Sequence, residues 1–260
     1  MKFRIGLSIF LLITLVVVCC TLISPILSSV AFAQETKRPV IIIDPGHGGE
    51  DLGAVGVNGI QEKDVVLDIS KELEKYLVEN LNAVVRFTRD RDVFIELAER
   101  TTMANDYEAD VFISLHANAS PRKKLSGFEI YYLDNTQDAA SKKLAERENA
   151  SHAQSGNSDL GFILSDMIQN HKLADSVRLA KSISAGVEQF VLHNWPGSTN
   201  LGVKKGPFYV LVGAHMPCVL VELFFIDHKL DGERLAKTDF RKDLAYALYL
   251  GIEQFLSANS

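Results

Sequence analysis

Three side chains that can bind a metal stand where predicted strands end or a predicted helix begins. His47 follows the apolar run Val40–Ile43 within the stretch DPGHGGEDLG. His116 directly follows a second apolar run, Asp110–Leu115, and Glu62 begins an amphipathic segment. Ligands bind at the carboxyl ends of strands in open α/β sheets, so we expect the three to meet if the two strands are parallel neighbours. Two imidazoles and one carboxylate form the ligand set of a catalytic zinc site with its fourth position open.

Each of these residues also has an ordinary structural explanation. A histidine after a strand is often a hydrogen-bonded core or loop residue, and Glu62 at a helix start is favoured by the helix dipole. The glycines around His47, which are Gly46, Gly48 and Gly49, allow the backbone to turn its ring toward a metal. The chain has no short-range motif such as His-Glu-x-x-His at these residues. Spacing alone therefore leaves both interpretations open.

A second carboxylate, Glu222, ends the apolar run PCVLVE. A carboxylate close to a metal but not bound to it can accept a proton from the attacking water and later donate it to a leaving amine. Amide hydrolysis needs both transfers, because the amide is a poor electrophile and the amine a poor leaving group. The alternative is that Glu222 is the buried partner of a Lys or Arg. The remaining histidines are predicted to be solvated or capping residues: His152, His171, His193, His215 and His228.

Apolar strands that alternate with amphipathic helices predict an α/β domain with a mainly parallel or mixed sheet. The predicted strands are 40–43, 83–88, 110–115, 128–133, 208–212 and 219–223. The predicted helices are 62–79, 94–103, 173–192 and 240–256. Residues 194–205 contain two Gly and a Pro and are predicted to be a loop. These elements belong to one domain.

Residues 1–33 have the features of a secretory signal peptide. Lys2 and Arg4 precede an apolar stretch that runs from Ile5 to about Ile26, and Ala-Phe-Ala at 31–33 fits a signal-peptidase site. The apolar stretch is also long enough for an uncleaved membrane anchor. In either case the remainder is exported, and we expect it in the periplasm or cell envelope. Contact with a membrane is expected only through an uncleaved leader.

The remaining residues, 34–260, fit one large domain with a full hydrophobic core. The leader holds two basic and no acidic residues, so its removal changes the net charge from −6 to −8. No basic tract stands out, which argues against nucleic acid as a ligand. Cys218 is the one cysteine after the leader, so an internal disulfide is excluded. Its apolar surroundings predict a core residue.

Five stretches together resemble the zinc-dependent N-acetylmuramoyl-L-alanine amidases that separate daughter cells. They are IIIDPGHGGEDLGAVG, GIQEKDVVLDISKEL, VVRFTRDRDVFIELAERTTMAND, DVFISLHANAS and PCVLVELFFIDH, in order across residues 38–256. The resemblance implies one Zn²⁺ per chain bound by His47, Glu62 and His116, with Glu222 as the catalytic carboxylate. It also implies a six-stranded sheet flanked by helices. The implied substrate is peptidoglycan, cut between the lactyl group of N-acetylmuramic acid and L-Ala of the stem peptide.

One position departs from the resemblance. Such amidases often carry a glycine two residues after the catalytic glutamate, whereas this chain carries Phe224. We expect the bulkier ring to reshape the floor of the substrate groove and so to affect fine substrate preference. Two other functions remain open: a zinc peptidase that cuts within cell-wall peptides, and an inactive wall-binding module. The inactive module is disfavoured because all four implied site residues are present.

Residues 134–172 change in composition and are predicted to be a helical insertion. In the long forms of the family that this chain resembles, an inserted helix crosses the zinc cleft and a glutamate occupies the open coordination position until a LytM-like activator displaces it. The candidate helix here is DAASKKLAERENA. Glu148 is the predicted inhibitory residue and Glu146 the second choice; about 200° of helix separates them, so at most one can face the metal. The alternative is a solvated helix with ordinary surface charge.

The same insertion contains a less polar segment around Phe162 and Ile163. If exposed, this segment forms an apolar surface of the kind that marks interaction sites. We predict that it binds the activator. If packed down, it is a short core helix instead.

Overall fold

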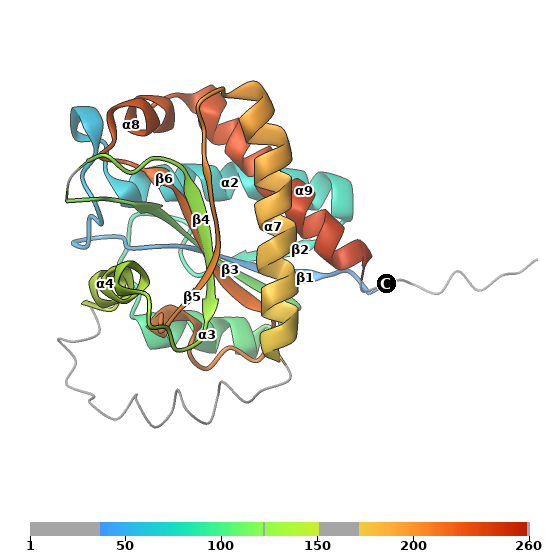
Figure 1. Cartoon of the computed structure of the whole chain (residues 1–260). Helices are drawn as coiled ribbons and strands as arrows, with labels where there is room; N and C mark the ends of the chain where they lie inside the picture. Colours follow the sequence, from blue (N-terminus) through green and yellow to red (C-terminus); the bar gives the residue numbers. More distant parts are fainter. Residues whose placement is uncertain (1–36, 122, 151–171, 259–260) are drawn as a thin grey trace, which may run out of the picture. The chain divides into compact units, whose positions relative to one another are not determined.

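The computed structural model describes residues 37–121, 123–150 and 172–258 (Figure 1). The predicted signal peptide and the predicted docking residues Phe162 and Ile163 lie outside this described part. Six strands form one sheet in the order β2-β1-β3-β6-β4-β5. They are β1 (Val40–Pro45), β2 (Val84–Phe87), β3 (Val111–Asn118), β4 (Phe128–Leu133), β5 (Asn200–Gly206) and β6 (Cys218–Phe225).

The sheet is mixed but mostly parallel. Strands β4 and β6 pair antiparallel, and every other neighbouring pair is parallel. This confirms the predicted single α/β domain with a six-stranded sheet. Strands β1 and β3 are parallel neighbours, as a site shared by His47 and His116 requires.

Helices cover both faces of the sheet (Figure 1). Side chains of α2 (Glu62–Leu81), α7 (Lys172–Asn194) and α9 (Thr238–Ser257) share one apolar cluster with the sheet. Side chains of α3 (Leu97–Asp106) and α4 (Ala139–Glu148) share a second cluster on the opposite face. The remaining elements are α8 (Lys229–Leu235) and the short 3₁₀ helices η1 (Val57–Gly59) and η2 (Tyr209–Leu211). No helix within 37–121, 123–150 or 172–258 has the length and apolar content needed to cross a membrane.

The alternation of side chains along the strands decides which face carries the polar groups. Ile41 and Ile43 belong to the cluster with α2, α7 and α9, whereas Ile42 belongs to the cluster with α3 and α4. Because side chains on a strand alternate with a period of two, Asp44 lies on the same face as Ile42. The same argument from Phe112 in β3 and Leu220 in β6 places His116 and Glu222 on that face. Polar groups of three central strands therefore lie on the face covered by α3 and α4.

Two predicted elements are wrong, and each has a physical reason. The predicted loop at 194–205 contains most of β5, an edge strand that pairs only with β4 and is mostly half-buried. Such a strand has no apolar run to detect, and Gly202 within it has a φ of 90°. The predicted strand at 208–212 is the 3₁₀ turn η2, although Val210 and Leu211 are buried. The short apolar run at 208–212 therefore predicted the burial of most of these residues correctly but their strand conformation wrongly.

The carboxylate of Asp44 holds β1, β2 and β3 together at the start of the site. It is fully buried and accepts hydrogen bonds from Thr88 Oγ1 at 2.5 Å, Ser114 Oγ at 2.6 Å and Arg100 Nη1 at 2.8 Å. Burial by itself raises the pKa of Asp44, but the Arg100 charge and the two hydroxyl donors outweigh it, so the pKa lies below its ordinary value of 3.8. The native state therefore favours the ionised carboxylate.

We expect Asp44→Asn to lower the free energy of unfolding at pH 7 by about 3–5 kcal/mol, because it leaves the buried Arg100 charge without its anion. Since the folded pKa lies below the unfolded one, this stabilisation is complete above pH 3.8 and is lost as pH falls through the lower folded pKa. Urea unfolding at pH 7 and at pH 3 measures both effects. Asp106→Asn, at an exposed position in α3, is the control. Equal stability of Asp44→Asn and the wild type at pH 7 would contradict this account.

Candidate metal centre and active site

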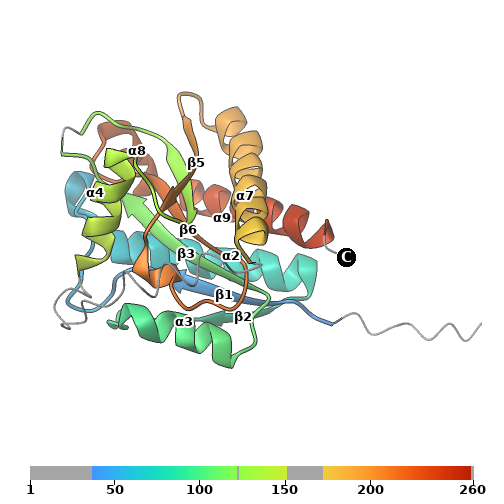
Figure 2. The ribbon, with the colours of Figure 1, turned by 60° about the horizontal axis from the view of Figure 1, so that its bottom comes forward.

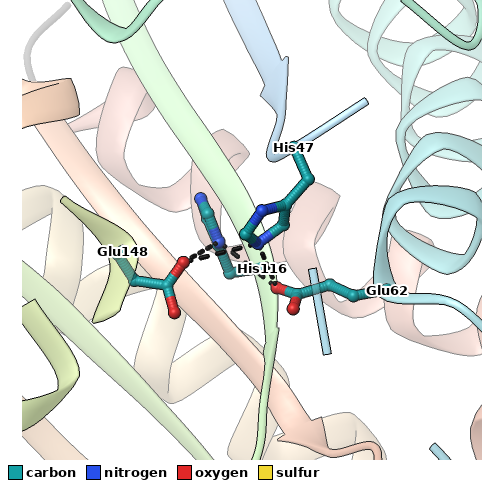
Figure 3. A group of neighbouring side chains, drawn as sticks. All are labelled: His47, Glu62, His116 and Glu148. Atoms are coloured by element: carbon teal, nitrogen blue, oxygen red, sulfur yellow. Dashed lines mark ion pairs between the residues drawn. The ribbon is translucent and has the colours of Figure 1, made fainter. Parts of the chain in front are cut away.

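Four side chains from four different elements meet at one point (Figure 3). His116 lies on β3, and His47 lies in the turn after β1. Glu62 from the start of α2 and Glu148 from the end of α4 approach from opposite sides (Figure 3). One ligand atom from each side chain lies within 4.8 Å of the others. The structure thus brings together the three predicted metal ligands and the predicted inhibitory glutamate.

The four His–Glu distances in the cluster are close to those expected between neighbouring ligands of one metal ion. His47 Nε2 lies 3.1 Å from Glu62 Oε1 and 3.4 Å from Glu148 Oε2. His116 Nδ1 lies 3.3 Å and 3.0 Å from the same two oxygens. Tetrahedral zinc with bonds of about 2.0–2.1 Å places its ligand atoms roughly 3.3–3.4 Å apart. These separations leave space for one small cation.

Three of the four facing atoms are buried without a hydrogen-bond partner among the described residues. They are His47 Nε2, His116 Nδ1 and Glu148 Oε2. Buried polar atoms are nearly always hydrogen-bonded, so such a cluster calls for an explanation. A cation bound by all of these atoms would satisfy them at once. The donor set, two imidazoles and two carboxylates, is one that zinc accepts.

The pKa values of the clustered side chains depend on one another's charges. Burial lowers the pKa of His116, but the carboxylates of Glu148 and Glu62 outweigh it and raise the pKa to about 9. The pKa of His47 is likewise raised, by Glu62 and Asp51 against the effect of burial. Burial raises the pKa of Glu148, yet the charge of His116 brings the net value well below its ordinary range. In this ion-paired state the imidazoles hold protons that a bound metal would replace.

Hydrogen bonds behind the site orient the ligand atoms. Asp51 Oδ2 lies 3.0 Å from His47 Nδ1, which leaves Nε2 to face the centre. The backbone N–H groups of Ala117 and Ala54 donate to the two oxygens of Glu62, each at 2.8 Å. Such partners fix the orientation of a ligand, and the Asp51 carboxylate also raises the basicity of the His47 ring. Sequence reasoning missed Asp51, although its place four residues after His47 was a usable signal.

Glycine is required where the backbone passes closest to the ligands. A Cβ at Gly46 would lie 2.5 Å from two atoms of the His116 ring. A Cβ at Gly53, where φ is +64°, would lie 2.6 Å from the His47 ring and 2.7 Å from Glu62 Oε2. Gly46 is therefore needed for the close approach of β1 to His116. The sequence predicted only that Gly46, with its neighbours, lets the backbone turn the His47 ring; the close approach to His116 is an additional requirement.

Glu222 lies beside the cluster without joining it. It is directly opposite His116 in the parallel pairing of β3 and β6. Its carboxylate is fully buried, and neither oxygen has a hydrogen-bond partner among the described residues. Burial and the nearby charge of Glu148 raise its pKa well above the ordinary value. A carboxyl group with a raised pKa next to a candidate metal is suited to hold and transfer a proton.

Helix α4 covers the carboxyl ends of the central strands (Figure 2). Leu144 and Ala145 pack into the second apolar cluster, and Asp138 caps the helix by accepting from the Ser141 N–H. With this face docked, Glu148 is buried and Glu146 is exposed. The geometry thus favours the first predicted residue over the second.

Arg147 joins α4 to the rest of the site. Its Nε donates to Glu148 Oε1 at 2.8 Å, and its other nitrogens donate to Ala119 O and to Asn118 Oδ1. Nη2 also lies 4.0 Å from Glu222 Oε1. Glu222 therefore has an arginine neighbour, as one of its alternative interpretations required, but only at the limit of an ion pair.

A cleft of about 940 Å³ opens over the cluster. Its lining includes His47, Glu62 and Glu148 together with Phe94 and Lys123. Phe224 does not line it, so the expectation that this ring reshapes the groove floor is wrong. The ring is fully buried, with its centroid 5.8 Å from that of Phe128 and 5.3 Å from that of Phe240. What the position does require is a left-handed backbone, with φ at 68°, which glycine adopts more easily.

The six-stranded sheet and its His/Glu group define an α/β protein with a candidate metal centre at the carboxyl ends of its strands. Residues 41–254 match the family described as Amidase_3, N-acetylmuramoyl-L-alanine amidase. The chain belongs to this family.

Individual relatives agree with this assignment. The chain is 36% identical over 234 residues to the N-acetylmuramoyl-L-alanine amidase AmiC of Neisseria meningitidis. This match covers 87% of this chain and 55% of that protein. It is 33% identical over 224 residues to AmiA of Escherichia coli, covering 83% of this chain and 75% of that protein. The solved structure of AmiC2 of Nostoc punctiforme has a TM-score of 0.63 and 30% identity, and the match covers 84% of this chain and 97% of that one. The chain spans about half the length of the AmiC proteins of N. meningitidis and E. coli.

Proposed function

We propose that this protein is an exported, zinc-dependent N-acetylmuramoyl-L-alanine amidase that cuts peptidoglycan between N-acetylmuramic acid and L-Ala during cell-wall remodelling and cell separation. Family membership supports the reaction and the substrate. The leader-like residues 1–33 support export. The observation that carries the proposal is that four side chains able to bind a metal meet at one point, with the buried carboxylate of Glu222 beside them.

In the proposed mechanism His47, Glu62 and His116 hold one Zn²⁺. When bound, the metal would supply Lewis-acid chemistry at the scissile carbonyl and at the attacking water. Glu222 performs the proton transfers: it accepts a proton from the attacking water and delivers it to the leaving amine. Its burial next to His116 suits this role, because a carboxyl group with a raised pKa can retain a proton until the amine departs.

We infer further that the conformation described here is a resting, inhibited one. Glu148 occupies the fourth corner of the site and leaves no open position for a substrate carbonyl. Opening requires α4 to leave the sheet edge, which breaks the contacts of Glu148 with both histidines. An activator of the LytM-like kind implied by the resemblance would stabilise the open form. Phe162 and Ile163 remain the proposed docking residues.

Zinc binding is tested by His116→Ala. We expect the variant to bind zinc at least about 100-fold more weakly than the wild type, because it loses one of three ligands that must act together. Competition against a chromophoric chelator measures the affinity. The control is His193→Ala, at an exposed position near the end of α7. Unchanged affinity in His116→Ala would remove His116 from the site.

The reaction is tested by mass spectrometry of digested cell walls. The proposed amidase releases free stem peptides that begin with L-Ala and leaves glycan strands without peptides. A zinc peptidase would instead cut within the stem peptides and leave L-Ala attached to muramic acid. An inactive wall-binding module would release neither product.

A further inference from the structure

The turn that carries His47 is held by buried basic side chains that act on its backbone. Arg89 lies just after β2 and is 3% exposed. Its Nε donates to Pro45 O at 2.8 Å, and its Nη2 donates to Gly46 O at 2.7 Å. The same Nη2 donates to Lys63 O at 2.8 Å. Arg89 thereby ties the end of β1 to the first turn of α2, where Glu62 lies.

Arg100 continues the same set of contacts from α3. It is 1% exposed and forms the buried ion pair with Asp44. Its Nη1 also donates to Pro45 O at 3.0 Å, and its Nη2 donates to His47 O at 3.0 Å. Arg100 therefore contacts the backbone of His47 itself.

Lys63 completes the set from the first turn of α2. Its Nζ donates to Gly49 O at 2.8 Å and to Asp92 Oδ2 at 2.8 Å. The other oxygen of Asp92 accepts from the Gly49 N–H at 2.7 Å. Hydrogen bonds thus hold the glycine-rich turn at its start, Pro45 and Gly46, and at its end, Gly49.

The burial of three cationic side chains close together is energetically unfavourable, which indicates a functional role. Burying a charged side chain is unfavourable unless it is paired and hydrogen-bonded. Here three cations lie together, and backbone carbonyls accept several of their hydrogen bonds. Burial and the like charge of Arg100 lower the pKa of Arg89 to about 10.

The turn itself is strained where it carries the ligand. His47 has a φ of 60°, a left-handed conformation that non-glycine residues seldom adopt. Such a conformation persists only where the surroundings over-determine it, and it is concentrated at functional sites. Within the turn, the backbone pair of Gly48 and Asp51 and the contact of Asp51 with His47 Nδ1 restrain it, but the glycines on both sides add no side-chain packing.

We propose that Lys63, Arg89 and Arg100 form a positioning clamp that holds the backbone of residues 45–49 so that His47 Nε2 faces the metal centre before a metal binds. The inference rests on the proposed zinc site and extends it to three residues that do not contact the metal. Without the clamp, metal binding would have to order the glycine-rich turn itself. The affinity for metal would then fall while the ligand atoms remained present.

The test compares Arg100→Lys and Arg89→Lys with Arg86→Lys, whose guanidinium donates to Val85 O and lies over the Tyr107 ring, neither of which belongs to the turn. Lysine keeps the charge but cannot reach two carbonyls with a planar fork. We expect both clamp variants to bind zinc about 10–100-fold more weakly than the wild type, and Arg86→Lys to match it. Thermal unfolding of the metal-free proteins shows which variants are folded.

A spectroscopic measurement separates positioning from general stability. With Co²⁺ in place of zinc, we expect the visible bands of the clamp variants to change in position or intensity, because a displaced His47 alters the coordination geometry. If Arg100→Lys does not fold, Arg89→Lys and Lys63→Met decide the question. If the clamp variants fold and have the zinc affinity and cobalt spectra of the wild type, the clamp proposal is wrong but the proposed metal site is unaffected. A wild-type protein that binds no zinc overturns the proposed metal site as well.

Discussion

Replacement of Glu222 by Gln is expected to lower the rate of peptidoglycan hydrolysis by about 10²–10⁴-fold while zinc stays bound. The amide has nearly the same shape as the carboxyl group but can neither accept the proton of the attacking water nor deliver it to the amine. Glu222 lies outside the ligand group, so the metal affinity should be unchanged. Burial of a neutral amide in place of a carboxyl with a raised pKa is not expected to unfold the protein.

The measurement needs a protein whose site is open. We would therefore compare Glu222→Gln with its parent in a Glu148→Ala background and determine kcat together with bound zinc. Glu233→Gln, at an exposed position in α8, is the matched control for the chemical change. If Glu222→Gln retains both zinc and full activity, the proton transfers belong to another group and the proposed mechanism is wrong.

Replacement of Glu148 by Ala is expected to raise the basal rate at least tenfold. In the structure its Oε2 lies 3.0 Å from His116 Nδ1 and 3.4 Å from His47 Nε2, where a fourth ligand would stand. The apparent activity of an enzyme scales with the fraction of molecules in the competent state. Removing the carboxylate takes away the ion pairs of α4 with both histidines and opens the coordination position even if α4 stays docked.

The same helix provides the control for this prediction. Glu146 lies two residues away, carries the same charge and is exposed. Glu146→Ala should leave the basal rate unchanged, whereas Glu148→Ala should raise it and weaken zinc binding only modestly, since three ligands remain. Equal basal rates for the two variants would show that Glu148 does not inhibit, whatever its position in the resting structure.

The placement of Glu148 shows how far helix periodicity alone could reach. Two glutamates about 200° apart cannot both face one point, so the sequence permitted at most one. Which one faces inward depends on how α4 docks, and Leu144 and Ala145 decide this by packing against the sheet. The same kind of limit explains the error at β5. Its pairing with β4 was invisible because an edge strand with half-buried residues has no periodic apolar signal.

By itself, the sequence determined the alternation of strands and helices, the burial of the central strands and the residue types of the site. These follow from apolar runs and local spacing, which are properties of neighbouring residues. Only the tertiary structure decided that His47 presents Nε2 and His116 Nδ1, that Phe224 lies in the core, and that Arg89 and Arg100 hold the His47 turn. The packing of Phe224 against Phe128 and the hold of Arg89 and Arg100 on the turn depend on contacts between residues more than forty positions apart, as when Arg100 reaches His47 O across 53 residues. Such contacts leave no local pattern, because they are formed when the strands and helices pack.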